Sequence, residues 1–262
     1  MTSGAAGAPP GGLPVLPPVF NLIALDSVGS TNDEARRLAE EGAAHGTIVW
    51  AGEQTTGRGR QGRSWTSPRG NLYLSLVLRP ECALSEAAQV SFVACVALGE
   101  AVAALAGKQV VVTYKWPNDV MFNAKKGAGV LLESKSTPAG GLDWLILGMG
   151  TNIEHFPDDA RYPASSLRKE GADTTLVPAI LLEELARQLD IWLEIWRNRG
   201  FRDIRAAWKE RAQGLGKPIE VRLPKETLTG VFGDLDGDGA LLLKNADGGT
   251  RTITAGDVFP GA

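Results

Sequence analysis

The chain begins with alternating strand-like and helix-like hydrophobic patterns. Short, mostly apolar runs at residues 20–26, 46–53 and 71–78 fit β-strands, and the last of them alternates as a strand does. Residues 85–105 instead carry apolar side chains at the spacing of a helix face, and Gly107 follows as a stop signal. We therefore predict a buried helix that backs a β-sheet.

The same two patterns continue as far as residue 212. Predominantly apolar strands are predicted at residues 110–114, 130–133 and 144–152. Amphipathic helices are predicted at residues 178–199 and 201–212, and this helical pair closes the larger domain. Strands and helices in this mixed order predict the α+β class, a mixed β-sheet with helices packed on it.

From Gly214 onward the pattern is wholly strand-like. Short alternating segments separated by turn residues predict a small β-barrel of the SH3-like type. We divide the chain into a disordered lead-in rich in Gly and Pro (1–18), a larger domain (19–213) and a C-terminal domain (214–262). The strands predicted for the C-terminal domain are residues 218–223, 228–232, 240–243 and 250–254.

One segment of the C-terminal domain, residues 234–239, is similar to the first half of a calcium-binding loop. Asn245 stands where such a loop needs a bidentate glutamate, and strands rather than helices flank the segment. We predict a hairpin turn there.

The composition is that of an ordinary globular protein. Of 262 residues, 44% are hydrophobic and 22% charged, and no uninterrupted apolar run is long enough to span a bilayer. The N-terminus lacks the regions of a signal peptide. Cys82 and Cys95 are too few for a disulfide framework, and His45 and His155 have no metal-ligand spacing. These features predict a reducing, cytoplasmic location.

The most unusual stretch runs from Gly52 to Arg79. Arg58, Arg60, Arg63 and Arg69 are interleaved with glycines, in a chain whose formal net charge is -3. Arginine offers a planar set of donors to carboxylates and phosphates, and glycine lets a ligand approach the backbone. We predict an anion-binding loop on a strand scaffold.

Three other interpretations of this loop are weaker. Residues 57–62 satisfy the spacing of a dinucleotide-binding fingerprint, but a strand rather than a helix follows them. A dedicated nucleic-acid site conflicts with a pI near 5.6. A solvated, flexible loop is the simplest alternative, and Trp65 and the strong strand behind it argue against it.

Two further polar clusters adjoin predicted strands. Lys115, Asn118 and Asp119 come after the strand at residues 110–114, where Pro117 marks a turn or bulge. Asn and Asp are common turn residues, but a lysine, an amide and a carboxylate at a strand end also suit a phosphate and metal site.

The second cluster is Lys125 and Lys126, on a predicted turn with Gly127 and Gly129 that leads into the strand at residues 130–133. Two lysines on a turn are usually just solvated. The residues alone therefore leave both interpretations open.

Near the N-terminus, Ser30, Thr31 and Asn32 precede a short helical pattern that Gly42 would end. Thr31 with Glu34 fits a capping box. A helix start is also a place where donors converge on a polar ligand, so both interpretations can hold.

Three motifs together resemble one family. GRGRQGRSW (57–65), KWPNDV (115–120) and KKGAG (125–129) are similar, in order and spacing, to the catalytic domain of biotin protein ligases. The resemblance covers roughly residues 20–260 and implies a class II synthetase-like mixed sheet with an SH3-like C-terminal domain. Some ligases of this family add an N-terminal helix-turn-helix domain; we expect the monofunctional type without one.

The resemblance implies a set of biotin-binding residues. In the family, a Ser-Thr-Asn segment lies against the ureido ring, and a lysine three residues before a glycine bridges the biotin carboxylate and the α-phosphate. Lys126 and Gly129 hold that spacing; Gly127 stands where the family has a larger aliphatic residue, which keeps Lys125 as an alternative. The residues implied for biotin are Ser30, Thr31, Asn32, Gln54, Gly57, Arg58, Arg60, Lys126 and Gly129.

The resemblance also implies nucleotide contacts. Trp65 would stack on the adenine or close over the adenylate, and its alternative is core packing. Asp119 would position Mg²⁺ or the adenylate, or activate the acceptor lysine, and these roles stay open. The residues implied for ATP or adenylate are Arg60, Arg63, Trp65, Asn118, Asp119, Lys126 and Asn152, with Lys126, Asp119 and Arg60 as the catalytic ones.

The implied activity is ATP- and Mg²⁺-dependent ligation of biotin to protein. Biotinyl-5′-AMP would form first, and biotin would then pass to a lysine of a biotin carboxyl carrier protein domain of acetyl-CoA carboxylase or a related carboxylase. The alternatives are a lipoate or other acyl ligase of the same superfamily, and a non-catalytic biotin- or nucleotide-binding module. No nucleic-acid or membrane partner is expected, and a sheet border, such as residues 110–114, could pair with a second copy in a homodimer.

Overall fold

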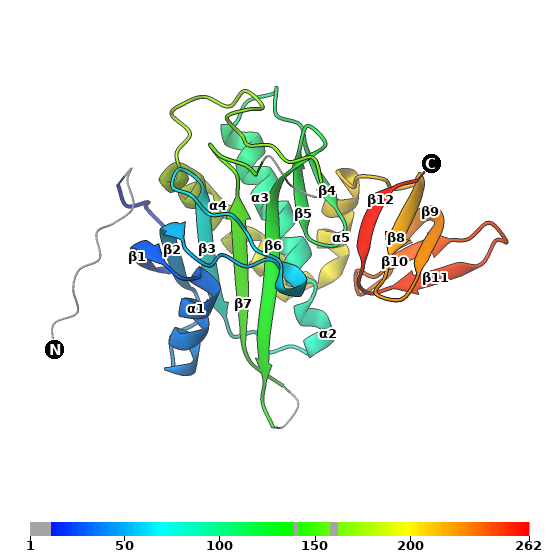
Figure 1. The fold of residues 1–262 in the computed structure, drawn as a ribbon. Coiled ribbons are helices and arrows are strands. Elements are labelled where there is room, and N and C mark those ends of the chain that lie inside the picture. The colour runs from blue at the N-terminus through cyan, green and yellow to red at the C-terminus, as the bar shows by residue number, and fades with distance from the viewer. Residues whose placement is uncertain (1–11, 139–140, 158–161, 262) are drawn as a thin grey trace.

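A seven-stranded mixed β-sheet forms the centre of the molecule (Figure 1). The computed structural model describes residues 12–138, 141–157 and 162–261. The strand order is β1-β2-β3-β7-β6-β5-β4; β1 and β2 are parallel, and the other neighbours are antiparallel. The strands are β1 (Asn21–Val28), β2 (Thr47–Gln54), β3 (Leu72–Leu78), β4 (Val112–Lys115), β5 (Asp119–Phe122), β6 (Lys125–Ser136) and β7 (Leu142–Thr151).

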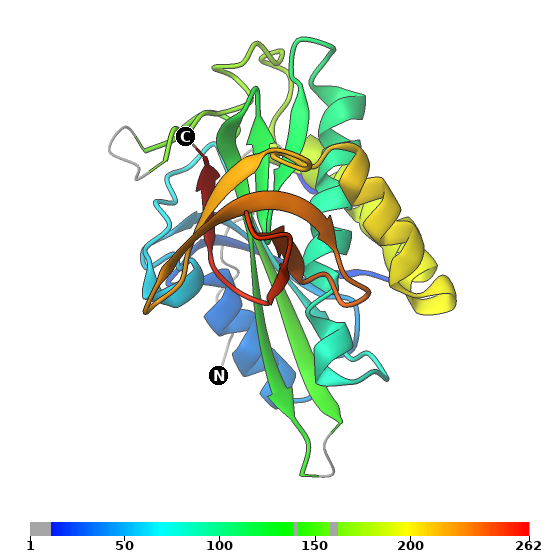
Figure 2. The same cartoon turned by 90° about the vertical axis from the view of Figure 1, so that its right-hand side faces the viewer.

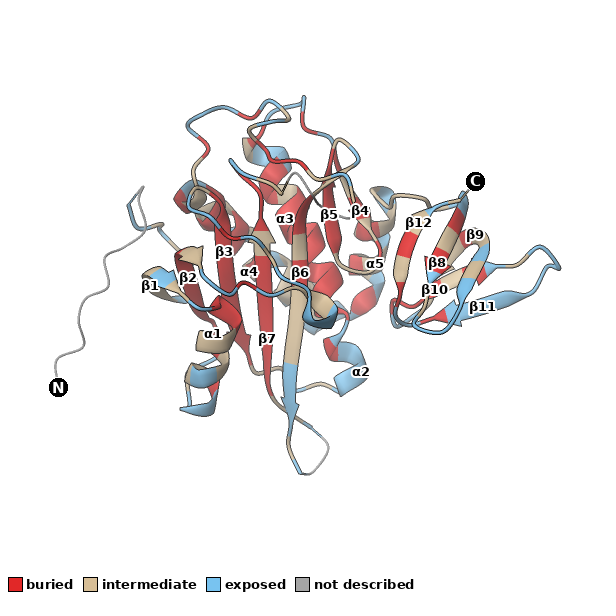
Figure 3. Ribbon diagram, viewed as in Figure 1, coloured by how far each residue is buried: buried red, intermediate tan, exposed pale blue. Residues whose placement is uncertain are grey.

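Helices cover the sheet unequally on its two faces. On one face, α1 (Thr31–Glu40) packs on β2, β3 and β7. On the other face, α3 (Val90–Leu105), α4 (Pro178–Arg199) and α5 (Phe201–Glu210) pack on one another, and α3 and α4 contact the sheet. Every residue of β3 is therefore buried (Figure 3), and the part of β6 and β7 beyond α1 is left for a binding site.

The predicted helix at residues 85–105 is two helices, because α2 (Leu84–Ala87) precedes α3. By length and composition, the stretch Leu84–Leu105 is apolar enough to cross a membrane, which the sequence interpretation overlooked. Of its most apolar 18-residue window, 72% is buried inside the fold, where α3 contacts both the sheet and α4. It is the core helix that the apolar pattern predicts.

A second, antiparallel sheet of five strands lies beside the first in Figure 1 and in front of it in Figure 2. Its order is β11-β10-β9-β8-β12, and among the described residues the border strands β11 and β12 do not pair. The small SH3-like β-unit is therefore confirmed, without hydrogen-bonded closure into a barrel. Its strands are β8 (Pro218–Arg222), β9 (Thr227–Leu235), β10 (Leu241–Lys244), β11 (Thr250–Ile253) and β12 (Asp257–Pro260), of which the last was not predicted.

The two sheets share one hydrophobic core. Phe232 and Leu235 of the second sheet belong to the same buried cluster as Trp208 of α5. Trp116 Nε1 donates to Gly239 O at 2.9 Å across the boundary. Gly239 lies in the turn between β9 and β10, which confirms the hairpin predicted for residues 234–239.

Two predictions of local structure were wrong. The N-cap of α1 is Ser30, and the Thr31 hydroxyl bonds Gln54 instead of forming a capping box. The lysines predicted on a turn, Lys125 and Lys126, belong to β6.

The predicted domain boundaries stay predictions. Residues 1–11 of the expected lead-in lie outside the described part of the chain. The described Val15 donates its backbone N–H to Glu183 Oε2 of α4 at 3.1 Å.

Candidate active site

A pocket of about 390 Å³ lies between the arginine loop, defined here as residues 55–71, and the face of β6 and β7. Figure 1 shows this loop crossing in front of both strands. Among the predicted site residues, Gly57 does not line the pocket. Those that line it are Ser30, Thr31, Asn32, Gln54, Arg58, Arg60, Arg63, Trp65, Asn118, Asp119, Lys126, Gly129 and Asn152.

Gly57 lies behind the pocket wall. A Cβ there would be 2.4 Å from Trp65 O and 2.5 Å from Ser67 Oγ. Trp65 N donates to Gly57 O at 2.9 Å. Because a side chain has no room, glycine lets the two arms of the loop close on each other, and it shapes the pocket without facing it.

The end of the pocket beside α1 offers neutral donors and acceptors. Thr31 N and Oγ1 lie 2.8 and 3.0 Å from Gln54 Oε1. Gln54 Nε2 donates to Ser67 Oγ at 2.9 Å, which anchors the far arm of the loop. Ser30 makes no side-chain capping bond among the described residues, so its hydroxyl is left for a ligand.

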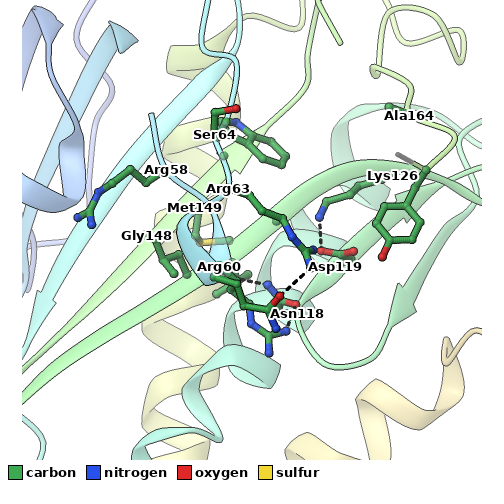
Figure 4. A pocket seen from close by; sticks show the side chains of 18 of the residues that line it. Arg58, Arg60, Arg63, Ser64, Asn118, Asp119, Lys126, Gly148, Met149 and Ala164 are labelled. Atoms are coloured by element: carbon green, nitrogen blue, oxygen red, sulfur yellow. Dashed lines mark hydrogen bonds and ion pairs between the residues drawn. The ribbon is translucent and has the colours of Figure 1, made fainter. Parts of the chain in front are cut away.

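Arg58 is directed differently from the other loop arginines. Its Nη2 lies 2.6 Å from Asp33 Oδ1 and 3.2 Å from Glu133 Oε1. In Figure 4 its guanidinium points away from Lys126 and Asp119. Arg58 therefore fastens the loop to α1 and β6, and its charge is already balanced by carboxylates.

The opposite end of the pocket is charged (Figure 4). Lys126 Nζ lies 2.5 Å from Asp119 Oδ1, across the β5–β6 pair. Arg60 Nη1 donates to Asn118 Oδ1 at 2.8 Å, and Asn118 Nδ2 donates to Val130 O at 2.6 Å. A loop arginine is thus joined to the segment that follows β4.

The two neighbouring lysines have different surroundings. Lys126 lines the pocket, whereas Lys125 does not. Lys125 Nζ donates to Glu170 Oε1 at 2.8 Å, and Asn123 Nδ2 donates to Glu170 Oε2 at 2.8 Å. Burial opposes ionisation of Glu170, but the hydrogen bonds from Lys125, Ser165 and Asn123 outweigh it and lower its pKa to about 2. Lys125 therefore already has a strong partner outside the pocket.

A β-bulge interrupts the pairing of β6 with β5 beside Lys126. Val120 pairs with Ala128 and Met121 pairs with Lys126, so Gly127 is the extra residue. A Cβ on Gly127 would lie 2.0 Å from Phe122 Cδ2. The bulge therefore packs tightly against the Phe122 ring, which leaves no room for the larger aliphatic residue that the family has at this position.

Trp65 covers the glycines at the centre of the pocket. A Cβ on Gly150 would lie 2.5 Å from Trp65 Nε1, and one on Gly129 would lie 3.4 Å from Trp65 Cζ3. Lys126 Nζ lies 5.6 Å from the Trp65 ring centroid. The indole nitrogen is buried without a hydrogen-bond partner among the described residues. Trp65 is therefore a pocket residue, placed between the neutral and the charged ends.

The C-terminal sheet contributes residues that the sequence interpretation missed. Gly256, Asp257 and Val258, at the start of β12, line the pocket. Arg63 Nη2 lies 2.6 Å from Asp257 Oδ2, which fastens the arginine loop to this sheet. A contact between positions so far apart in the chain leaves no local sequence signal.

Lys115 was predicted in the phosphate and metal cluster with Asn118 and Asp119, but it was not among the residues implied for biotin or ATP. Its Nζ lies 4.0 Å from the Tyr162 ring centroid and 5.5 Å from that of Phe259. These two rings are 5.2 Å apart, and Arg222 Cζ lies 4.0 Å from the Phe259 centroid on β12. Cations and aromatic rings thus link the larger sheet to the C-terminal one.

Electrostatics favour an anion at this end. Burial lowers the pKa of Arg60 and of Lys115, because desolvation disfavours the charged form. The hydrogen bond that Arg63 donates to the Asp257 carboxylate raises the pKa of Arg63. A bound phosphate would add negative charge beside these two half-buried cations, Arg60 and Lys115.

The described residues contain no cluster of three or more His, Cys, Asp or Glu side chains that could hold a metal ion. The carboxylates that line the pocket are Asp119 and Asp257, and each is paired with a cation. Mg²⁺ is commonly held by one or two carboxylates together with substrate phosphates. Asp119, beside the cationic end, fits that arrangement.

Comparison with known proteins identifies the class to which this fold and pocket belong. The family profile described as the biotin/lipoate A/B protein ligase family matches residues 61–210. The profile of the biotin protein ligase C-terminal domain matches residues 214–261. The chain belongs to this family of ligases.

Individual relatives narrow the class. The chain is 39% identical over 237 residues to a biotin–[acetyl-CoA-carboxylase] ligase from Paracoccus denitrificans, with 88% of this chain and 97% of that protein covered. A biotin protein ligase from Aquifex aeolicus in complex with biotin and ATP superposes with a TM-score of 0.78 at 29% identity, with 92% of this chain and 99% of that one covered. One from Leishmania major in complex with biotinyl-5-AMP gives 0.62 at 27% identity, with 91% and 100% covered.

Proposed function

We propose that this protein is an ATP-dependent biotin–protein ligase. The observation that carries the proposal is a single pocket with a neutral polar end at Thr31 and Gln54 and a cationic end at Lys126 and Arg60. Biotin has the same polarity, a neutral urea at one end and a carboxylate at the other. The relatives whose names or bound ligands include biotin and ATP support the assignment.

The first step activates the biotin carboxylate, which is a poor electrophile. A carboxylate oxygen attacks the α-phosphorus of ATP, the bond between the α-phosphorus and the bridging oxygen breaks, and pyrophosphate leaves. Both reactants are anions, so catalysis depends on cancelling charge between them. Lys126 would bridge the carboxylate and the α-phosphate, and Arg60 and Arg63 would bind the phosphates.

The second step transfers biotin to a lysine amine. The neutral amine attacks the acyl carbon of biotinyl-5′-AMP, and the bond to the AMP oxygen breaks. The amine must lose a proton, for which a carboxylate near the acyl carbon is a suitable acceptor. Asp119 can take this role once Lys126 has turned from it to the ligand, because its oxygen is then free to accept.

Mg²⁺ would be held by Asp119 and the ATP phosphates, and it would reduce the negative charge on the phosphates. The acceptor would be a biotin carboxyl carrier protein domain, and the location would be cytoplasmic. A second copy would pair at β1, because the opposite border, β4, already exchanges backbone hydrogen bonds at Tyr114 with Arg211 and Gln213.

The experiment that tests this proposal measures pyrophosphate release with Mg-ATP and biotin, with lipoate in a parallel reaction. We expect release with biotin and none above background with lipoate. Release with lipoate alone would indicate an acyl ligase of the same family with another substrate. Binding of biotin without release in the presence of ATP and a carrier domain would indicate a non-catalytic module.

A further inference from the structure

Behind the neutral end of the pocket lies a group of hydrogen bonds that the reaction itself does not use. Ser75, at the centre of β3, is fully buried and does not line the pocket. Its Oγ lies 2.6 Å from Asn32 Oδ1 and 2.8 Å from Thr31 Oγ1. Glu133 of β6 also lies outside the lining, and its Oε2 accepts from Asn32 Nδ2 at 2.7 Å. Two residues outside the pocket thus hold two side chains that line it.

Glu133 fixes the direction of these bonds. A carboxylate accepts and does not donate, so the Asn32 amide must turn its nitrogen to Glu133 and its oxygen to Ser75. Ser75 must then give its single proton to Asn32 Oδ1, and its oxygen can accept only from the Thr31 hydroxyl. The Glu133 carboxylate is also paired with Arg58, 3.2 Å away.

The direction of the hydrogen bonds around Gln54 is fixed in the same way. Ser67 donates its proton to the carbonyl of Trp65 at 2.8 Å, so it can only accept from Gln54 Nε2. Gln54 therefore turns its oxygen to Thr31. The Thr31 hydroxyl has one proton for two acceptors, Ser75 Oγ at 2.8 Å and Gln54 Oε1 at 3.0 Å.

We propose that Ser75 and Glu133 are positioning residues that set the donor and acceptor pattern of this end of the pocket, so that it selects a neutral cyclic urea. Asn32 keeps a second N–H, which has no partner among the described residues and can donate to a urea carbonyl oxygen. Gln54 Oε1 already accepts from Thr31 N at 2.8 Å, and the Thr31 hydroxyl oxygen is left without a donor in the described part of the chain once Ser75 donates to Asn32. The Thr31 oxygen can therefore accept from a urea N–H. The inference rests on the proposed function, which supplies a urea as the group bound here.

The packing behind Asn32 gives its amide little freedom. Gly148 of β7 lies against it, and a Cβ on Gly148 would be only 2.0 Å from Asn32 Oδ1. The amide can therefore exchange its oxygen and nitrogen by a flip, but it cannot move aside. Whether it flips depends on what Glu133 and Ser75 offer it.

The test compares the binding of biotin with that of 2-iminobiotin. In this analogue a protonated imino group replaces the urea oxygen near neutral pH, so a donor stands where biotin has an acceptor. Both ligands are titrated by calorimetry into the full chain. Because a site built to donate rejects a ligand without the matching acceptor, wild type is expected to prefer biotin by at least about 100-fold.

Two variants and one control are compared with wild type. In Glu133→Gln the new amide can donate as well as accept, so Asn32 can flip and offer its oxygen to iminobiotin. Ser75→Ala removes the proton that holds Asn32 Oδ1. We expect each variant to narrow the preference for biotin by about tenfold, the scale of one hydrogen bond. Asp33→Asn removes the other carboxylate beside Arg58 without touching Asn32, and it should leave the preference unchanged.

Each result of this comparison either supports or overturns the proposal. An unchanged preference in Glu133→Gln and Ser75→Ala, with biotin still bound, overturns the proposal. An equal narrowing in Asp33→Asn also overturns it, because the effect would then act through Arg58. Glu133 is partly exposed, and thermal unfolding of its variant shows that a change in preference is not a loss of fold. If wild type binds no biotin at all, it is the proposed function that fails, and the inference falls with it.

Discussion

Lys126 Nζ lies 2.5 Å from Asp119 Oδ1, within the wall of the pocket. The two residues sit on adjacent strands, where the bulge at Gly127 shifts the register between them. In the proposed mechanism, Lys126 turns from Asp119 to a ligand anion and thereby releases the carboxylate. One ion pair would then serve both steps of the proposed reaction.

The first prediction concerns the two adjacent lysines. Lys126→Ala should lower biotin-dependent pyrophosphate release by at least about 100-fold, because a charge that cancels repulsion in the transition state is lost. Lys125→Ala is the matched control: its ammonium is bound to Glu170 outside the pocket, and release should stay within about threefold of wild type. The reverse order of the two effects would transfer the role to Lys125.

The second prediction concerns the aromatic rings that contact the Lys115 ammonium group. Phe259→Leu removes one aromatic face beside the Lys115 ammonium, and the Michaelis constant for ATP should rise about two- to fivefold, the scale of a cation–π contact. The constant for biotin should not change, because the residues proposed to bind biotin, from Thr31 to Lys126, do not include Lys115 or Phe259. Phe259→Tyr keeps the ring and should resemble wild type. A rise for both substrates would mean that the variant disturbs the whole pocket.

The third prediction is a pH dependence of stability. Glu170 has a pKa of about 2 in the folded protein and an ordinary value of 4.5. A lowered folded-state pKa contributes stability that is present above about pH 4.5 and is lost as the pH falls toward 2. Glu170→Gln should therefore lower the free energy of unfolding by about 1–2 kcal/mol at neutral pH. This range is smaller than the full pKa shift implies, because solvent screens part of the interaction. Urea unfolding at a series of pH values measures this, and a difference that does not shrink on acidification would contradict it.

The fourth prediction uses the tight bulge at Gly127. Gly127→Ala places a methyl group in the space of the Phe122 ring and should cost about 1–3 kcal/mol of stability. Phe122→Leu in the same chain makes room for part of that methyl. The double variant should therefore lose less than the sum of the two single ones, which a double-mutant cycle measures. Additive losses would show that the strain lies elsewhere.

Much of the architecture follows from local patterns. The helix at residues 178–199 has the bounds of α4, and the strands at 46–53, 71–78 and 144–152 differ from the observed ones by one or two residues at their ends. Apolar periodicity determines these elements because each buries a continuous face. β12 escaped prediction because it is a four-residue strand that ends in a proline.

The site was only partly accessible from the sequence. Motif spacing brought out Lys126, Asp119 and Arg60, which the structure gathers around one pocket, while their roles stay predictions. Asp257 contacts the arginine loop from a different sheet, and no local sequence pattern predicts such a contact. The positioning role proposed for Ser75 was not predicted for another reason. A small residue in an apolar strand is usually interpreted as part of the core packing.

The most direct test of the account is mass spectrometry of a biotin carboxyl carrier domain after incubation with this protein, Mg-ATP and biotin. We expect one lysine to gain the mass of a biotinyl group, and no gain when ATP is left out or lipoate replaces biotin. A lipoyl-sized gain with lipoate, and none with biotin, would contradict the account.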